Sequence, residues 1–214
     1  MNQPTSVAPE ASRTERRRAA IVQAATEVFL RNGYLGATTD EVATRASVSK
    51  QTLYKHFADK EHLFAEIILD NTIQVGEGLA NAAADALRDA KDVRKALREV
   101  ADVFLRSMLK PEVIQLRRLV IAEADRFPDV GQAWYERGFE RTLAAIGEAM
   151  QALAERGLLH NVADPTLAAH QFASLVLYQP LNQLMFAGTR TRPSPAKLRR
   201  IADAAVDMFL ATYG

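Results

Sequence analysis

Residues 38–57 read TTDEVATRASVSKQTLYKHF, and they carry the clearest helix signals of the chain. Within it, Glu41 follows Thr38 at the spacing of a capping box, a pair that starts a helix. Val42 and Ala46 lie one turn apart on the helix that this box predicts, so they share its inward side. The stretch therefore begins with a helix of barely two turns.

A second short helix is predicted directly after the first. Ser49 is a favoured residue at a helix start, and Leu53 and Phe57 are one turn apart, so both face inward. The opposite side is then polar, aromatic and basic, and carries Lys50, Gln51, Tyr54, Lys55 and His56. An α-helix has the width that fits the major groove of DNA, and this helix leaves one polar face open for such a contact.

The flanking segments complete a small helical domain. Upstream, a single apolar stripe predicts a helix from about Arg13 that Asn32–Gly33 ends. The stripe consists of Ile21, Ala24, Ala25, Val28 and Phe29. Downstream, Asp59 is placed to cap a longer helix, whose apolar side carries Leu63, Phe64, Ile67 and Ile68.

The rest of the chain also has the signals of helices, because capping residues and prolines stand at their expected starts. The predicted segments are 92–109, 111–126, 128–157, 165–187 and a last helix from 195. No alternating strand pattern of useful length occurs. We therefore predict an all-α fold of about nine helices. Its parts are a disordered tail at 1–12, a three-helix helix-turn-helix domain at 13–60 and a second helical domain at 61–214.

Composition narrows the class of protein. The 214 residues contain no cysteine, no apolar run long enough to span a membrane and no secretory signal, so we expect a cytoplasmic protein without disulfides or thiolate chemistry. Residues 1–60 hold nine Lys and Arg against six Asp and Glu, whereas the remainder is slightly acidic. The successive arginines Arg16, Arg17 and Arg18 concentrate this basic excess. They suit either phosphate contacts or an ordinary solvated helix face.

The stretch from Ile21 to Phe64, including the run DKEHLF at 59–64, resembles the DNA-binding signature of the TetR family of transcription regulators. The resemblance implies a homodimer that binds a palindromic double-stranded DNA operator and is released by a small-molecule effector. It also implies a divergent C-terminal domain that dimerises through its last two helices. No catalytic residue, metal ligand or cofactor is expected.

Within the resemblance, we expect two kinds of DNA contact. Lys50, Gln51 and Thr52 are expected to reach base edges, with Thr52 contacting either a thymine methyl or a phosphate. The residues expected at phosphates are Thr39, Tyr54, Lys55, His56 and Lys60. The alternatives are that the Tyr54 ring packs along the helix, that His56 is merely solvated, and that Lys50 and Lys60 are plain surface lysines.

One residue departs from the family pattern. The turn between the two short helices usually contains glycine, whereas this chain has Ser47. If the turn needs a left-handed backbone, serine costs on the order of 1 kcal/mol there.

The C-terminal half offers a dimer surface and a ligand pocket. The final helix has an apolar face wider than one packing stripe, and residues 117–128 resemble the C-terminal domain of the AefR-like subgroup. Pro180 interrupts a helical run, and a kink there is expected to shape a pocket. The candidate ligand-binding residues are Met108, Trp134, Phe172, Tyr178, Gln179 and Gln183. The alternative for each aromatic residue is an ordinary place in the core.

Two other classes of protein are weighed against a regulator. An enzyme is disfavoured because the four histidines lack metal-site spacing, no nucleophile elbow occurs, and Gly76–Glu77–Gly78 follows no predicted strand. A helical scaffold that binds protein rather than DNA predicts an interaction insensitive to salt.

Overall fold

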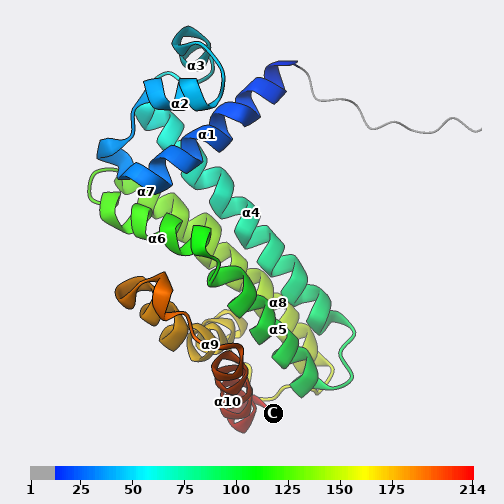
Figure 1. Ribbon diagram of the computed structural model, residues 1–214. Coiled ribbons are helices and arrows are strands. Elements are labelled where there is room, and N and C mark those ends of the chain that lie inside the picture. Colours follow the sequence, from blue (N-terminus) through cyan, green and yellow to red (C-terminus); the bar gives the residue numbers. More distant parts are fainter. Residues whose placement is uncertain (1–12) are drawn as a thin grey trace, which may run out of the picture. The chain divides into compact units, whose positions relative to one another are not determined.

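The computed structural model describes residues 13–214, apart from the side chain of Thr189; the predicted tail at 1–12 lies outside the described residues. Within this part of the chain all regular elements are helical (Figure 1). They are α1 (Arg13–Gly36), α2 (Thr39–Arg45), α3 (Lys50–His56), α4 (Lys60–Arg88), α5 (Val93–Met108), α6 (Pro111–Glu123), α7 (Pro128–Ala133), the π-helix η1 (Trp134–Glu140), α8 (Arg141–Glu155), α9 (Pro165–Ala187), the 3-10 turn η2 (Thr189–Thr191) and α10 (Pro195–Tyr213). Since α7, η1 and α8 follow one another without a break, the described residues form nine continuous helices of more than one turn, as predicted.

The predicted helix starts are confirmed by side-chain hydrogen bonds. The Thr38 hydroxyl accepts from the Glu41 amide at 3.2 Å, and the Ser49 hydroxyl accepts from the Thr52 amide at 3.1 Å. Four further helix starts have the same kind of cap, formed by Asp59, Asp92, Asp164 and Ser194. Each cap satisfies an amide that has no partner inside its own helix.

The chain divides into two compact units, Met1–Ile67 and Ile68–Gly214, with the division inside α4. The first unit includes the first turns of α4 because Phe64 packs there in a T-shaped pair with Phe29, at a ring distance of 5.3 Å. Our expected boundary at residue 60 leaves these turns out. The predicted end of the first helix at Gly33 corresponds to a break in α1, where Gly33 has φ 68°.

The second unit is built around a single large apolar cluster. Phe104 of α5, Phe172 of α9 and Phe209 of α10 are each nearly or fully buried, and they form a row of ring contacts. α9 packs against α5, α6, α8 and α10. α9 is thus the central element of this unit.

α4 closely approaches the π-helix η1 and the start of α8 at two glycines. A β-carbon added at Gly138 would lie 2.2 Å from Cγ2 of Thr72, and one added at Gly76 would lie 2.7 Å from Oγ1 of Thr142. Side chains larger than hydrogen therefore do not fit at either glycine without movement. This close approach sets one wall of the cavity described below.

α9 runs from Pro165 to Ala187 and includes the buried Pro180. Proline removes one backbone donor, so the Val176 carbonyl loses its partner four residues on. The helix nevertheless continues through Pro180 to Ala187. The expected pocket-shaping kink at this proline stays a prediction.

Candidate functional site

The first candidate site is the outer face of α3. Leu53 is fully buried and Phe57 is 3% exposed, so these two residues anchor the helix in the first unit as predicted. The side chains of Lys50, Gln51, Tyr54 and Lys55 are exposed on the opposite face. We call these four residues the α3 face.

The turn before α3 has a left-handed backbone, which is the case in which serine in place of the family's usual glycine carries a cost. Ser47 has φ 54°, a conformation in which an ordinary L side chain is strained. The amides of Ser47 and Val48 donate to the carbonyls of Thr44 and Ala43, at 3.1 and 3.0 Å. These bonds hold the strained turn and fix the direction in which α3 leaves it.

The structure places all eight residues predicted to contact DNA outside the core. The exposed ones are Lys50, Gln51, Tyr54 and Lys55, and the half-buried ones are Thr39, Thr52, His56 and Lys60. The Tyr54 hydroxyl lies 3.1 Å from Thr39 Oγ1, which joins the α3 face to the start of α2. Lys60 Nζ lies 4.3 Å above the ring of Tyr34. The set therefore occupies α3 and the first residues of α2 and α4.

Lys50 has an intramolecular partner on this surface. Its Nζ lies 2.8 Å from an Asp40 carboxylate oxygen. The hydrogen bond and the charge of Asp40 raise the pKa of Lys50, so its ammonium stays charged. The charge of Lys50 is therefore partly neutralised by Asp40 within the protein itself.

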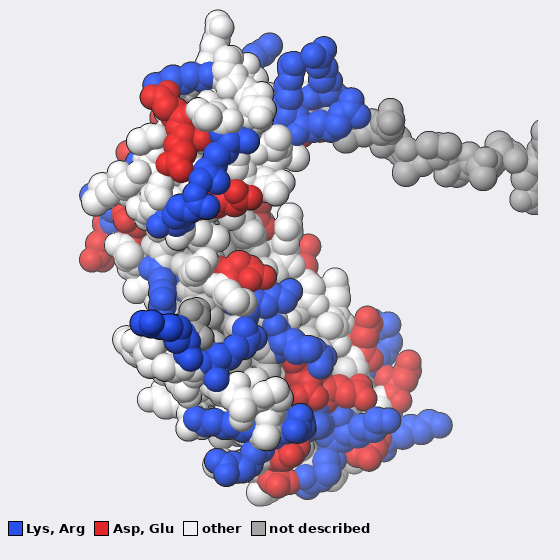
Figure 2. Space-filling view, in the orientation of Figure 1, with Lys and Arg blue, Asp and Glu red and all other residues white. Residues whose placement is uncertain are grey.

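The successive arginines Arg16, Arg17 and Arg18 near the start of α1 are all exposed. Figure 2 shows a group of Lys and Arg side chains where α1 begins. Arg18 forms an ion pair with Glu66, and its Cζ lies 5.8 Å from the Phe57 ring centroid. Arg18 thus has a role inside the first unit, whereas the surface position of Arg16 and Arg17 suits either phosphate contacts or solvation.

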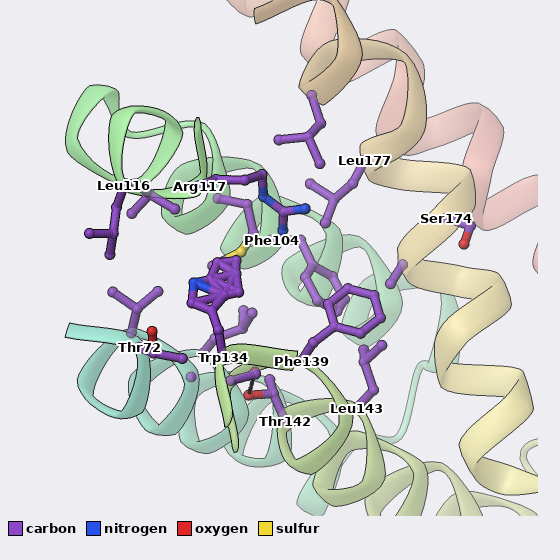
Figure 3. A pocket seen from close by; sticks show the side chains of 18 of the residues that line it. Thr72, Phe104, Leu116, Arg117, Trp134, Phe139, Thr142, Leu143, Ser174 and Leu177 are labelled. Carbon is purple, nitrogen blue, oxygen red and sulfur yellow. Dashed lines mark hydrogen bonds between the residues drawn. The ribbon is translucent and has the colours of Figure 1, made fainter. Parts of the chain in front are cut away.

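The second candidate site is a cavity of about 240 Å³ in the second unit (Figure 3). Six elements contribute to its lining: α4, α5, α6, η1, α8 and α9. Its walls are mostly apolar, with aromatic rings from Phe104, Trp134 and Phe139. A mostly apolar hollow with few polar groups is the usual form of a small-molecule site.

Three of the six predicted ligand-binding residues line this cavity, namely Met108, Trp134 and Tyr178. The other three are placed elsewhere. Phe172 is fully buried in the apolar cluster, and Gln179 is exposed. Gln183 donates to the Thr191 carbonyl and accepts from Lys197 Nζ at 3.1 Å, so it ties the end of α9 to η2 and to the first turn of α10.

Sequence reasoning missed the charged residue of the cavity. Arg117 was part of the stretch compared with the AefR-like subgroup, but nothing in the spacing separates it from its neighbour Arg118. In the structure Arg117 lines the cavity, and its guanidinium Cζ lies 5.1 Å from the Trp134 ring centroid (Figure 3). Burial lowers the pKa of Arg117 from the ordinary arginine value.

The described residues contain no group of three or more His, Asp or Glu side chains arranged to hold a metal ion. Among residues 13–214, no helix is both long and apolar enough to cross a bilayer.

Two family models match the chain. The model described as "Bacterial regulatory proteins, tetR family" matches residues 21–67. The model described as "AefR-like transcriptional repressor, C-terminal domain" matches residues 95–214, which is more than half of the chain. The chain belongs to the TetR family. Both resemblances seen in the sequence are thereby confirmed, and TetR proteins are transcription regulators rather than enzymes, as we expected.

Solved TetR-family structures are similar over almost the whole length. A TetR-family regulator from Mesorhizobium loti MAFF303099 is 43% identical, with a TM-score of 0.90 over 95% of this chain and 100% of that one. A TetR-family regulator from Pseudomonas syringae pv. tomato is 28% identical, with a TM-score of 0.72 over 94% and 98% of the two chains. These matches confirm the predicted all-α architecture with an N-terminal helix-turn-helix.

Curated TetR-family relatives match over shorter stretches. The transcriptional activator FasR of Mycolicibacterium smegmatis is 37% identical over 90 residues, which are 42% of this chain and 39% of FasR. The regulator QacR of Staphylococcus aureus is 46% identical over 48 residues, which are 22% of this chain and 26% of QacR. The alignments thus span well under half of either relative.

Proposed function

We propose that this TetR-family regulator is a cytoplasmic homodimeric repressor that binds a palindromic operator and leaves it when a small, mostly apolar effector occupies the cavity. The observation that carries DNA binding is the α3 face. Its polar and basic residues stand open while Leu53 and Phe57 hold the helix from behind. Such a helix is suited to reading base edges in the major groove.

The proposed roles on this surface differ in kind. Lys50, Gln51 and Thr52 contact bases, because they lie in the first turn of α3, the part that a recognition helix directs at base edges. Thr39, Tyr54, Lys55, His56 and Lys60 contact phosphates and position the helix. The bond between Tyr54 and Thr39 supports this division, since it groups two hydroxyls beside the helix rather than at its tip.

Fluorescence anisotropy with DNA from upstream of the protein's own gene tests DNA binding. We expect affinity to fall steeply as salt rises, since each phosphate contact by Lys or Arg releases counterions. Gln51→Ala is expected to lower the preference for the selected sequence over random DNA by about tenfold, whereas Lys55→Ala weakens binding to both. The proposal is contradicted if DNA affinity does not depend on salt. It is also contradicted if the Gln51→Ala variant prefers the selected sequence as strongly as the unchanged protein does.

The proposed dimer forms through α9 and α10. These two helices pack side by side in the second unit (Figure 1). They also expose large apolar side chains, with Phe186 87% and Met208 61% exposed. Apolar surface of this kind is typical of a face that another chain covers. A dimer is needed to place two recognition helices about 34 Å apart, one turn of DNA.

The response to a small molecule is supported by the cavity and by a relative. A solved structure named "Flavonoid-responsive Regulator FrrA" is 26% identical over 92% of this chain, with a TM-score of 0.73. By thermodynamic linkage, an effector that weakens DNA binding must itself bind more weakly to the DNA complex. Equal effector affinities for free and DNA-bound protein therefore contradict effector release but leave DNA binding untouched.

Repression rather than activation is proposed because the larger family match is to AefR-like transcriptional repressors. A reporter gene placed behind the operator separates the two. Repression predicts higher expression when the regulator is deleted, whereas activation predicts lower expression.

A further inference from the structure

The cavity contains one charged side chain among the residues that line it. Arg117 is that residue, and the lining has no Asp, Glu or Lys. Several other polar groups of the lining already have internal partners. The hydroxyls of Thr72, Thr142 and Ser174 donate to the carbonyls of Ile68, Gly138 and His170, at 2.6, 2.6 and 2.8 Å. Arg117 is therefore the strongest polar group that faces a ligand.

Arg117 lacks the kind of partner that comparable arginines have. Its Nε is buried without a hydrogen bond, and its described contact is with the face of the Trp134 ring. The Nε of Arg118, the next residue, also has no hydrogen-bond partner, but Nη2 of that guanidinium donates to the carbonyls of Leu184 and Met185 at 2.6 and 2.8 Å. Arg98 of α5 forms ion pairs with two aspartates.

Arg117 is half-buried, and a cation in this position without an anionic partner has lost hydration that nothing in the lining fully replaces. Arginine does not lose its proton in proteins, so the cavity keeps its positive charge at every ordinary pH. The aromatic face of Trp134 compensates only part of the lost hydration. A carboxylate supplies what is missing, because its two oxygens match the guanidinium donors.

The indole N–H of Trp134 gives a second indication. Trp134 Nε1 is also buried without a hydrogen-bond partner. Both unpaired groups are donors, so the ligand has to bring acceptors. One arginine balances one negative charge, and a phosphate dianion would leave part of its charge uncompensated in an apolar space.

We propose that the cavity binds a compact apolar acid, in which a single carboxylate pairs with Arg117 and the hydrocarbon part lies against Phe104, Phe139 and Trp134. This inference rests on the proposed effector response and assigns its chemical class. The cavity volume of about 240 Å³ suits a short aryl-alkyl or medium-chain acid.

Trp134 is the single tryptophan of the chain, so intrinsic fluorescence reports on the cavity itself. The probes are 4-phenylbutyrate and decanoate, each compared with the amide of the same acid. We expect saturable changes in fluorescence, with each acid binding about tenfold more tightly than its amide. In Arg117→Met the acid preference is expected to fall below about threefold, with amide binding little changed.

Two controls separate the ligand role of Arg117 from a structural one. Arg106→Met removes the same charge from an exposed position of α5 and should keep the acid preference. Thermal melting without ligand gives the second control. Arg117→Met should melt at or above the temperature of the unchanged protein, because a half-buried charge without an anionic partner has been removed. A lower melting temperature together with an unchanged acid preference overturns the proposal.

Other outcomes are also decisive. The proposal fails if neither acid binds, if the amides bind as tightly as the acids, or if the preference survives in Arg117→Met. Acids that bind at Trp134 but do not change DNA affinity support the ligand class while rejecting effector release. If the protein binds DNA but neither acid, the assignment of the ligand class fails while the proposed DNA binding stands.

Discussion

The hydroxyl oxygen of Tyr54 lies 3.1 Å from Thr39 Oγ1, and this contact joins the middle of α3 to the first residue of α2. Both residues belong to the surface proposed to face DNA phosphates. The pair therefore has two tasks, since it holds two short helices in register and presents two hydroxyls together.

Removing the Tyr54 hydroxyl tests the second of these tasks, the contact with DNA phosphates. Tyr54→Phe should weaken operator binding by about threefold to tenfold, because one hydrogen-bonding group is lost. Anisotropy titrations over a salt series should show an unchanged slope, since the phenol carries no charge. Lys55→Ala is the matched control, and it should reduce the slope by about one. A Tyr54→Phe protein that binds like the unchanged one would limit the hydroxyl to its contact with Thr39.

The strained turn predicts a stabilising substitution. Ser47→Gly should raise the free energy of unfolding by about 1 kcal/mol, because glycine adopts the positive φ of 54° without a β-carbon clash. Urea denaturation measures this change. Ser49→Ala, two residues on, should have the opposite sign and cost about 1 kcal/mol, since it removes the cap of α3. A destabilised Ser47→Gly protein contradicts the strain argument.

The ion pair of Lys50 with Asp40 predicts an unusual gain in DNA affinity. Asp40→Asn should increase affinity about threefold or more, because it frees the Lys50 ammonium and removes a negative charge beside the α3 face. The control Asp85→Asn removes an equal charge from the second unit and should leave affinity unchanged. The comparison is made by anisotropy at low and high salt. Weaker binding by Asp40→Asn means that Asp40 positions Lys50 for the DNA.

The contact of Gly138 with Thr72 predicts a coupled pair of substitutions. Gly138→Ala should lower the free energy of unfolding by about 1–3 kcal/mol, because its β-carbon meets Thr72 Cγ2. Thr72→Ser removes that methyl group and keeps the hydroxyl that donates to the Ile68 carbonyl. The double variant should recover much of the loss, which a double-mutant cycle measures. If the free-energy changes of the two single substitutions simply add in the double variant, the Thr72 methyl group is not what clashes with the new β-carbon.

The proposed dimer face predicts the effect of a buried charge. Met208→Glu should raise the dimer dissociation constant by about tenfold or more, because an unpaired carboxylate enters an apolar contact. Ile121→Glu changes a similarly exposed apolar residue of α6, 62% exposed, and serves as the control. Sedimentation velocity across a concentration series distinguishes them. Equal behaviour of the two variants argues against α10 as the interface.

Much of the fold was predictable from local sequence. Thr38, Ser49 and Asp92 each start a helix where their hydroxyl or carboxylate faces an amide three residues on. The predicted capping box was right for Thr38 but not for the side chain of Glu41. The Glu41 carboxylate accepts from Asn32 at 2.8 Å and pairs with Arg45, so neighbours in space decide its partners.

The cavity was much less predictable than the helices. Trp134 and Phe172 were chosen on the same grounds, yet the first lines the cavity and the second lies in the core. The π-helix at Trp134–Glu140 was not predicted, because its wider winding has no simple sequence period. It carries Trp134, Gly138 and Phe139, all of which line the cavity.

The amino-acid order alone determined the helix starts and the two faces of α3, because those depend on atoms within one or two turns of each other. Only the tertiary structure decided that Arg117 enters an apolar cavity while Arg118 holds the end of α9. Adjacent residues on a helix point in different directions, and what each one meets is supplied by segments far away in the chain. The charge of the cavity is therefore a property of packing, whereas the two-faced helix proposed to contact DNA is a property of local sequence.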